Sequence, residues 1–196
     1  MLVTHKFCPT CGTSRLARGF TYEPQPGEEP EFVLNPPLFV GPEPEANTRG
    51  GKFYHGSCHC RAVTLALKSK PLDSSYFSGM AESNCGICSR LGVAWLYPQA
   101  NQVVMNGQDH LAYYTMGNGM LANGFCEICG VPIDNKFQEF SSSEPSLLSY
   151  RNRIFYIISR DGWFLNAKVM NDVDFPPMRV RYLNGWNDHK PTYVNP

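Results

Sequence analysis

The sequence predicts a mainly β fold with little helix, and two observations support this. Glycine and proline are both frequent, at 17 and 16 of 196 residues, which favours turns and loops over helical packing. Short β-branched or aromatic runs, bounded by turn residues, also recur along the chain. They predict strands at 61–68, 93–97, 102–105, 111–116, 154–159 and 179–183. Only residues 89–92 and 163–171 suit short helices.

The chain divides into three segments by composition. Residues 1–20 hold one short cysteine motif, and residues 51–196 hold the predicted strands. Between them, residues 21–50 contain seven prolines and six glutamates, with Arg49 as the only base. Such a segment buries too little apolar surface to form a core of its own. We therefore expect a linker or an extended arm at 21–50, with its apolar clusters docked on a compact domain at 51–196.

All eight cysteines lie in close pairs, which is the pattern of a metal-binding protein. The pairs are Cys8/Cys11, Cys58/Cys60, Cys85/Cys88 and Cys126/Cys129. A close pair presents two sulfurs to one ion, and two pairs complete a tetrahedral zinc site. Disulfides within a pair are disfavoured because the loops are too short. A redox dithiol at Cys85/Cys88 stays open as an alternative.

The local sequence around the pairs indicates how each presents its sulfurs. Cys58 and Cys60 lead into the predicted strand 61–68, where alternation would place both on one side and His59 on the other. Cys126 and Cys129 are followed by Gly130, which allows the positive φ of a metal-binding turn. Residues 7–12 and 125–130 both read F-C-x-x-C-G, so residues 1–20 resemble a second copy of that turn, a possible relic of a tandem domain.

Charge and hydropathy exclude several classes of function. Lys+Arg and Asp+Glu both number 17, so no basic excess favours nucleic acid. No apolar run approaches the roughly 20 residues that span a bilayer. The N-terminal residues lack the apolar stretch of a signal peptide, so we expect a reducing, cytoplasmic environment.

Three ordered motifs carry a family resemblance. They are G-S-C-H-C-x-A-V at 56–63, N-C-x-x-C-x-x-x-G at 84–92 and G-F-C-x-x-C-G at 124–130. With this order, residues 50–195 resemble the glutathione-dependent formaldehyde-activating enzymes and their centromere protein V relatives. The resemblance implies a β-tent fold with a structural zinc. Its ligands would be Cys58, Cys60, Cys126 and Cys129.

The resemblance further implies a second zinc at the middle motif, with Cys85 and Cys88 as ligands and catalytic residues. The expected activity is that of a carbon–sulfur lyase, an S-(hydroxymethyl)glutathione synthase type, with glutathione or another small thiol as partner. This chain departs from the family pattern at Ser83, which stands where the family has a third cysteine. Because a serine hydroxyl is a poor zinc ligand, a non-catalytic, zinc-stabilised adaptor of the same fold is the alternative function.

Two further hypotheses concern residues outside these motifs. Cys8 and Cys11 could join Cys85 and Cys88 in a closed four-thiolate site, or they are a leftover of a lost domain. Separately, three arginines could bind a glutathione carboxylate, although a solvated surface is the simpler interpretation: Arg151, Arg153 and Arg160.

Overall fold

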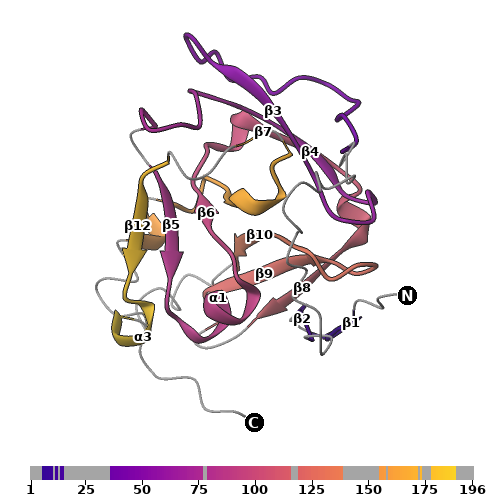
Figure 1. The fold of residues 1–196 in the computed structure, drawn as a ribbon, viewed down its shortest axis with the longest axis vertical. Helices are drawn as coiled ribbons and strands as arrows, with labels where there is room; N and C mark the ends of the chain where they lie inside the picture. The colour runs from indigo at the N-terminus through magenta and orange to yellow at the C-terminus, as the bar shows by residue number, and fades with distance from the viewer. Residues whose placement is uncertain are drawn as a thin grey trace, which may run out of the picture.

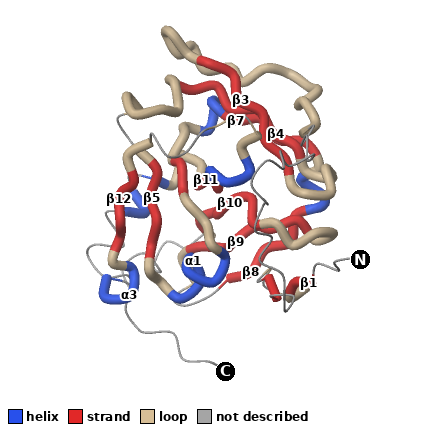
Figure 2. The backbone as a smooth tube through the Cα atoms, in the orientation of Figure 1, coloured by secondary structure: helices blue, strands red, loops and turns tan. Residues whose placement is uncertain are grey.

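A computed structural model describes residues 6–10, 12, 14–15, 36–76, 79–115, 119–138, 155–157, 159–171, 173 and 178–188. Strands make up most of the regular structure, and the helices are single short turns between them (Figure 2). The predicted mainly β fold with low helix content is confirmed. None of the helices in these ranges is long and apolar enough to cross a bilayer.

A seven-stranded sheet forms the larger part of the structure (Figure 1). Its strands run in the order β12 (Val180–Leu183), β5 (Met80–Ser83), β6 (Trp95–Leu96), β11 (Phe164–Asn166), β10 (Pro132–Phe137), β9 (Leu121–Cys126) and β8 (Leu111–Thr115). The pair β12 and β5 is parallel, and the other neighbours are antiparallel. The sheet therefore joins the last described strand, β12, to β5 from the middle of the chain.

A three-stranded sheet lies above it in Figure 1 and consists of β3 (Lys52–Ser57), β4 (Thr64–Ser69) and β7 (Val103–Asn106). The hairpin β3–β4 pairs Ser57 with Thr64, so the turn between these strands carries residues 58–63. A separate two-stranded hairpin, β1 (Lys6–Phe7) and β2 (Ser14–Arg15), flanks the first cysteine motif.

The two faces of the seven-stranded sheet carry different clusters of buried side chains. Leu96 of β6 and Leu165 of β11 belong to the main core, which also contains Leu65 and Leu67 of β4. Their neighbours Trp95 and Phe164 pack instead in a second cluster with Cys88. Since side chains alternate along a strand, these two clusters lie on opposite faces of the sheet.

The helices are short and occupy the connections. They are α1 (Gly86–Leu91), the 3-10 turns η1 (Ala100–Gln102), η2 (Gln108–His110) and η4 (Ala167–Val169), and α3 (Gly185–Asp188). Helix α1 ends at Gly92, which adopts φ 62° and donates its N–H to the Cys88 carbonyl at 2.9 Å. A glycine suits this left-handed position because other residues are strained there.

The described part of the Pro/Glu-rich arm, residues 36–50, lies against the domain without forming a helix or strand. Phe39 donates its backbone N–H to His55 Nδ1 at 3.0 Å, and the Asn106 side chain donates to the Val40 carbonyl at 2.8 Å. Ala46 also donates to the Asn101 carbonyl at 3.0 Å. This part of the arm therefore docks, but through hydrogen bonds: in the described apolar cluster at 38–40, Leu38 and Val40 are exposed.

Two of the predicted elements were wrong. Residues 155–157 and 159 are helical, where the sequence predicted a strand at 154–159. The Arg160 N–H bonds the Tyr156 carbonyl at 3.0 Å, and the Phe155 and Tyr156 rings pack edge-on against Phe137. Aromatic packing thus overrides the local β propensity. Residues 163–171, predicted as a helix, instead contain β11 followed by η4.

Candidate functional site

Four cysteines converge at the junction of the two large sheets. Their sulfurs all lie within 4.8 Å of one another: Cys58, Cys60, Cys126 and Cys129. The Sγ atoms of Cys58 and Cys60 are 3.5 Å apart, and so are those of Cys60 and Cys126. Sulfurs bound at about 2.3 Å to one tetrahedral ion lie about 3.8 Å apart, so this spacing fits a zinc ion.

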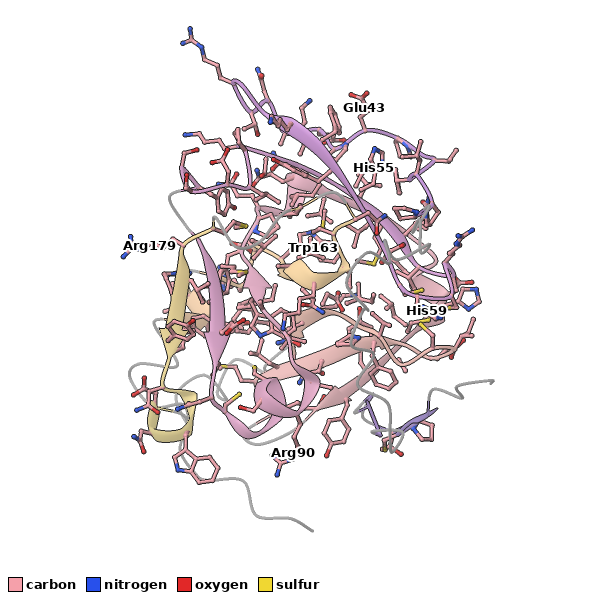
Figure 3. All side chains as sticks on the ribbon, viewed as in Figure 1. Glu43, His55, His59, Arg90, Trp163 and Arg179 are labelled. Carbon is pink, nitrogen blue, oxygen red and sulfur yellow. The ribbon has the colours of Figure 1, made fainter. Side chains whose placement is uncertain are left out.

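Two turns present these sulfurs. Cys126 ends β9, and Gly130 returns the chain with φ 75° and donates its N–H to the Cys126 carbonyl at 2.7 Å. Cys58 and Cys60 lie in the β3–β4 turn, where Arg61 takes a positive φ of 69°. The expectation that an extended strand presents this pair was wrong, because the strand begins only at Thr64. His59 in the same turn is exposed and lies outside the sulfur group, as expected (Figure 3).

The electrostatics of the four thiols also fit a cation. Burial raises the pKa of the Cys58 thiol, and it raises that of the Cys126 thiol well above the ordinary value. Burial acts in the same sense on Cys60, but hydrogen bonds from the Ala62 backbone and from neighbouring thiols outweigh it and lower its pKa. The protein alone therefore does not stabilise four thiolates. A bound divalent cation would do so, because it lowers the pKa of the thiols that bind it.

Cys85 and Cys88 form a second thiol site on the other face of the seven-stranded sheet. Cys85 precedes α1 and Cys88 lies in its first turn, where the Trp95 indole N–H donates to the Cys88 sulfur at 3.4 Å. A hydrogen bond from the Cys88 thiol lowers the pKa of Cys85 to about 5, with help from the Cys88 backbone N–H and Ser83. The partner Cys88 keeps its proton, since the bond to Cys85 and burial both raise its pKa.

The described residues around Cys85 supply few ligands for a metal. Only the four-cysteine group brings three or more Cys, His, Asp or Glu ligand atoms together within the described ranges. The Ser83 hydroxyl accepts the Cys85 backbone N–H at 3.2 Å. A catalytic zinc site has three protein ligands, so two sulfurs leave it incomplete. A second zinc at Cys85 and Cys88 therefore stays a prediction, and no reaction step is derived from it.

The first cysteine motif repeats the geometry of the last one. Gly12 adopts φ 72° and donates its N–H to the Cys8 carbonyl at 2.8 Å, as Gly130 does for Cys126. Gly12 packs closely on Phe125 of β9, where an added Cβ would lie 2.6 Å from the ring. Cys8 joins no group of three ligand atoms among the described residues, and Cys11 lies outside them. The described residues therefore do not form a closed site from Cys8, Cys85 and Cys88.

The three arginines named from the sequence gain no contact with the second thiol site among the described residues. Arg151 and Arg153 lie outside the described residues, and Arg160 pairs with the exposed Asp161 at 3.8 Å. A different arginine, Arg181 of β12, lies 5.5 Å from the centre of the Tyr97 ring, near Cys88. The sequence carried no signal for Arg181, because its position depends on the parallel pairing of β12 with β5.

The architecture is thus a low-helix β domain with a four-cysteine group that could hold a metal ion such as zinc. Residues 53–149 match the family described as glutathione-dependent formaldehyde-activating enzyme. The domain belongs to this family, and the resemblance in the sequence is confirmed. The fold is also similar to a crystal structure of a Rhodobacter sphaeroides protein, with 17% identity and a TM-score of 0.47. That match covers 66% of this chain and 99% of the other. The sequence has no significant match among curated proteins.

Proposed function

We propose that this protein makes and breaks the carbon–sulfur bond of an adduct between an aldehyde, such as formaldehyde, and a small thiol, such as glutathione. The proposal depends mainly on the pair Cys85 and Cys88. One thiol has a pKa of about 5 and is ionised at neutral pH, while its buried neighbour stays protonated. The family to which residues 53–149 belong supports the choice of substrates.

The four-cysteine group has a structural role in this proposal. Cys58, Cys60, Cys126 and Cys129 would hold a zinc ion and so link the β3–β4 turn to the β9–β10 turn. Structural zinc contributes on the order of 10 kcal/mol in small domains, which is comparable to the whole stability of a domain. The ion takes no part in the reaction, since the group lies on the opposite sheet face from Cys88.

The reaction is assigned to the sulfur of Cys85. Its thiolate adds to the aldehyde carbon, the C–O π electrons move to oxygen, and that oxygen takes one proton from solvent. The product is a hemithioacetal on Cys85. In the reverse step its hydroxyl proton returns to solvent, the C–O double bond re-forms, and the C–S bond breaks to release the aldehyde and the Cys85 thiolate. The small thiol then loses its proton to solvent, its thiolate adds to the aldehyde carbon, and the aldehyde oxygen takes one proton from solvent. Cys88 and Ser83 hydrogen-bond the Cys85 thiolate and hold it in place. The buried Trp95 fixes Cys88 in turn.

The test is the rate of exchange between free formaldehyde and S-hydroxymethylglutathione, measured by NMR. Because the reaction also proceeds unaided, the rate with protein is compared with the rate without it. We expect the wild-type protein to accelerate exchange and Cys85→Ala to lose the acceleration without a change in melting temperature. Ser89→Ala, an exposed change on the same helix, is the matched control and keeps full activity. Acceleration that survives in Cys85→Ala would exclude this cysteine as the reactive group.

A second candidate function is a non-catalytic, zinc-stabilised binding protein. Ser83 favours it, because the described middle motif offers only two sulfurs where a catalytic zinc site needs three ligands. This alternative predicts one zinc ion per chain and no acceleration of exchange by the wild-type protein. Both functions predict one zinc ion per chain at the four-cysteine group, so the NMR measurement of exchange is what separates them.

A further inference from the structure

Arg181 is placed beside the second thiol site by the edge strand β12. Its register partner on β5 is Ala81, which in turn pairs with Trp95 of β6. Neighbouring strands are about 4.8 Å apart. The Arg181 side chain therefore extends across β5 to reach the ring of Tyr97, the residue that directly follows β6. The guanidinium carbon lies 5.5 Å from the centre of that ring. The arginine thus points along the sheet face that carries Trp95 and Cys88, not out from the edge.

Among the described residues, no carboxylate forms an ion pair with Arg181. The ion pairs among the described residues join His110 to Glu127 and Arg160 to Asp161, and Arg181 takes part in neither. Its only described partner is the Tyr97 ring, which fixes one face of the guanidinium and leaves the N–H edges available. Arg90, by comparison, donates to the Gly86 carbonyl at 2.8 Å.

Two tyrosine hydroxyls feel this charge, and one of them, Tyr97, is a neutral donor on the face of Cys88. The Arg181 charge acts on the hydroxyls of both Tyr76 and Tyr97, so both lie within its electrostatic reach. Burial outweighs that charge and raises the pKa of Tyr97 to about 12, so the phenol keeps its proton at neutral pH. Neither phenol donates a hydrogen bond within the described part of the chain. Tyr76 packs against the main core on the opposite face, so the donors on the face of Cys88 are the Arg181 guanidinium and the Tyr97 hydroxyl, a pair suited to an anion.

We propose that Arg181, with Tyr97, binds a carboxylate of the small thiol and so determines substrate specificity. This inference rests on the proposed function, because it concerns the substrate of the site at Cys85 and Cys88. The Tyr97 hydroxyl is influenced by both Arg181 and Cys88, so anion and sulfur would be held on one face. In glutathione the glycine carboxylate belongs to the residue next to the cysteine, so it can lie within about 7 Å of the sulfur. The site would select carboxylate-bearing thiols over neutral ones such as 2-mercaptoethanol.

A binding experiment tests the inference without requiring turnover. The probe is S-methylglutathione, which has both carboxylates but no reactive thiol, titrated against the full chain by calorimetry. Charge-assisted hydrogen bonds contribute about 1.5–3 kcal/mol, so Arg181→Gln should weaken binding about tenfold or more. The matched control is Arg179→Gln. Arg179 lies two residues earlier and points away from the domain (Figure 3), so its variant should bind like the wild type.

A kinetic measurement gives a second readout. Arg181→Gln should lower the ratio of kcat/KM for glutathione over 2-mercaptoethanol about tenfold, and Arg181→Lys should restore part of it. Equal binding of S-methylglutathione by wild type and Arg181→Gln would overturn the inference, and so would an unchanged ratio. If S-methylglutathione binding depends on Arg181 but the protein does not accelerate formaldehyde exchange, the lyase function alone is refuted. Accelerated exchange that is indifferent to Arg181 would refute the carboxylate site alone.

Discussion

The buried carboxylate of Asp134 provides a quantitative test of the fold. Asp134 is 0% exposed, and only one of its oxygens has a partner. Oδ2 accepts the Tyr113 hydroxyl at 3.2 Å, while Oδ1 has no hydrogen bond. Burial is the main reason that the pKa of this carboxyl rises to about 6 from 3.8, because the nearby Lys136 only partly opposes it. We therefore predict that Asp134→Asn stabilises the protein at neutral and alkaline pH.

The expected size follows from the pKa shift. A rise of about two units corresponds to about 3 kcal/mol, since each unit is worth about 1.4 kcal/mol. The folded carboxyl binds a proton more tightly than the unfolded one, so the folded state holds more protons between pH 4 and pH 6. Stability therefore falls as the pH rises through that window, and the full penalty is present above it. Asp134→Asn should gain up to about 3 kcal/mol at pH 8 and little below pH 4.

The assay is denaturant unfolding of wild type and variant from pH 4 to pH 8. Asp161→Asn is the matched control, because the Asp161 carboxylate is 91% exposed and should leave the profile unchanged. The asparagine oxygen can still accept the Tyr113 hydroxyl, so this hydrogen bond is kept. An Asp134→Asn variant whose stability equals that of the wild type at pH 8 would refute the reasoning.

Two further predictions concern the cysteine motifs. Cys129→Ala should prevent the binding of one zinc ion per chain and lower the melting temperature by tens of degrees. His59→Ala, an exposed change in the β3–β4 turn, should still bind the ion. Elemental analysis and calorimetry check this, and a metal-free wild type of equal stability would contradict it. Ser83→Cys should raise the zinc content from one ion per chain to two, because a third sulfur would join Cys85 and Cys88; a constant content of one would show that position 83 is not placed as a ligand.

The sequence was informative where chemistry is local. Spacing alone identified the four cysteine pairs, and the family motifs predicted which two pairs meet, Cys58/Cys60 with Cys126/Cys129. Alternation predicted β4 and β7 to within about three residues. These features depend on a few adjacent residues and on turn glycines such as Gly130, so no distant contact is needed to detect them.

The sequence was uninformative where the structure depends on long-range pairing. Strands β9 and β10 hold buried polar residues, among them Asn123, Asp134 and Asn135, so they lack an apolar alternation and were not predicted. Residues 154–159 were predicted as a strand, yet the described ones, 155–157 and 159, are helical, and the Phe155 and Tyr156 rings pack on Phe137. Arg181 had no local signal, since only the parallel pairing of β12 with β5 brings it to the thiol site.

The alternation along β6 and β11 separates the four-cysteine group from the pair Cys85 and Cys88, as the proposed function requires. Leu96 and Leu165 face the core that contains Cys58, Cys126 and Cys129, while Trp95 and Phe164 face Cys88. A metal ion on the first face would compensate the negative charge of the thiolates that bind it. It would neither bind Cys85 on the second face nor weaken the charge of that thiolate. Loss of that ion should still abolish activity, because β9 carries Cys126 and also contributes Leu121 to the cluster around Cys88. Loss of the Cys85 thiol, by contrast, should leave the metal site and the fold intact, because Cys85 contributes to neither the four-sulfur group nor the main core. Changes at Cys85 should therefore affect chemistry alone, whereas changes at Cys126 should affect both folding and chemistry.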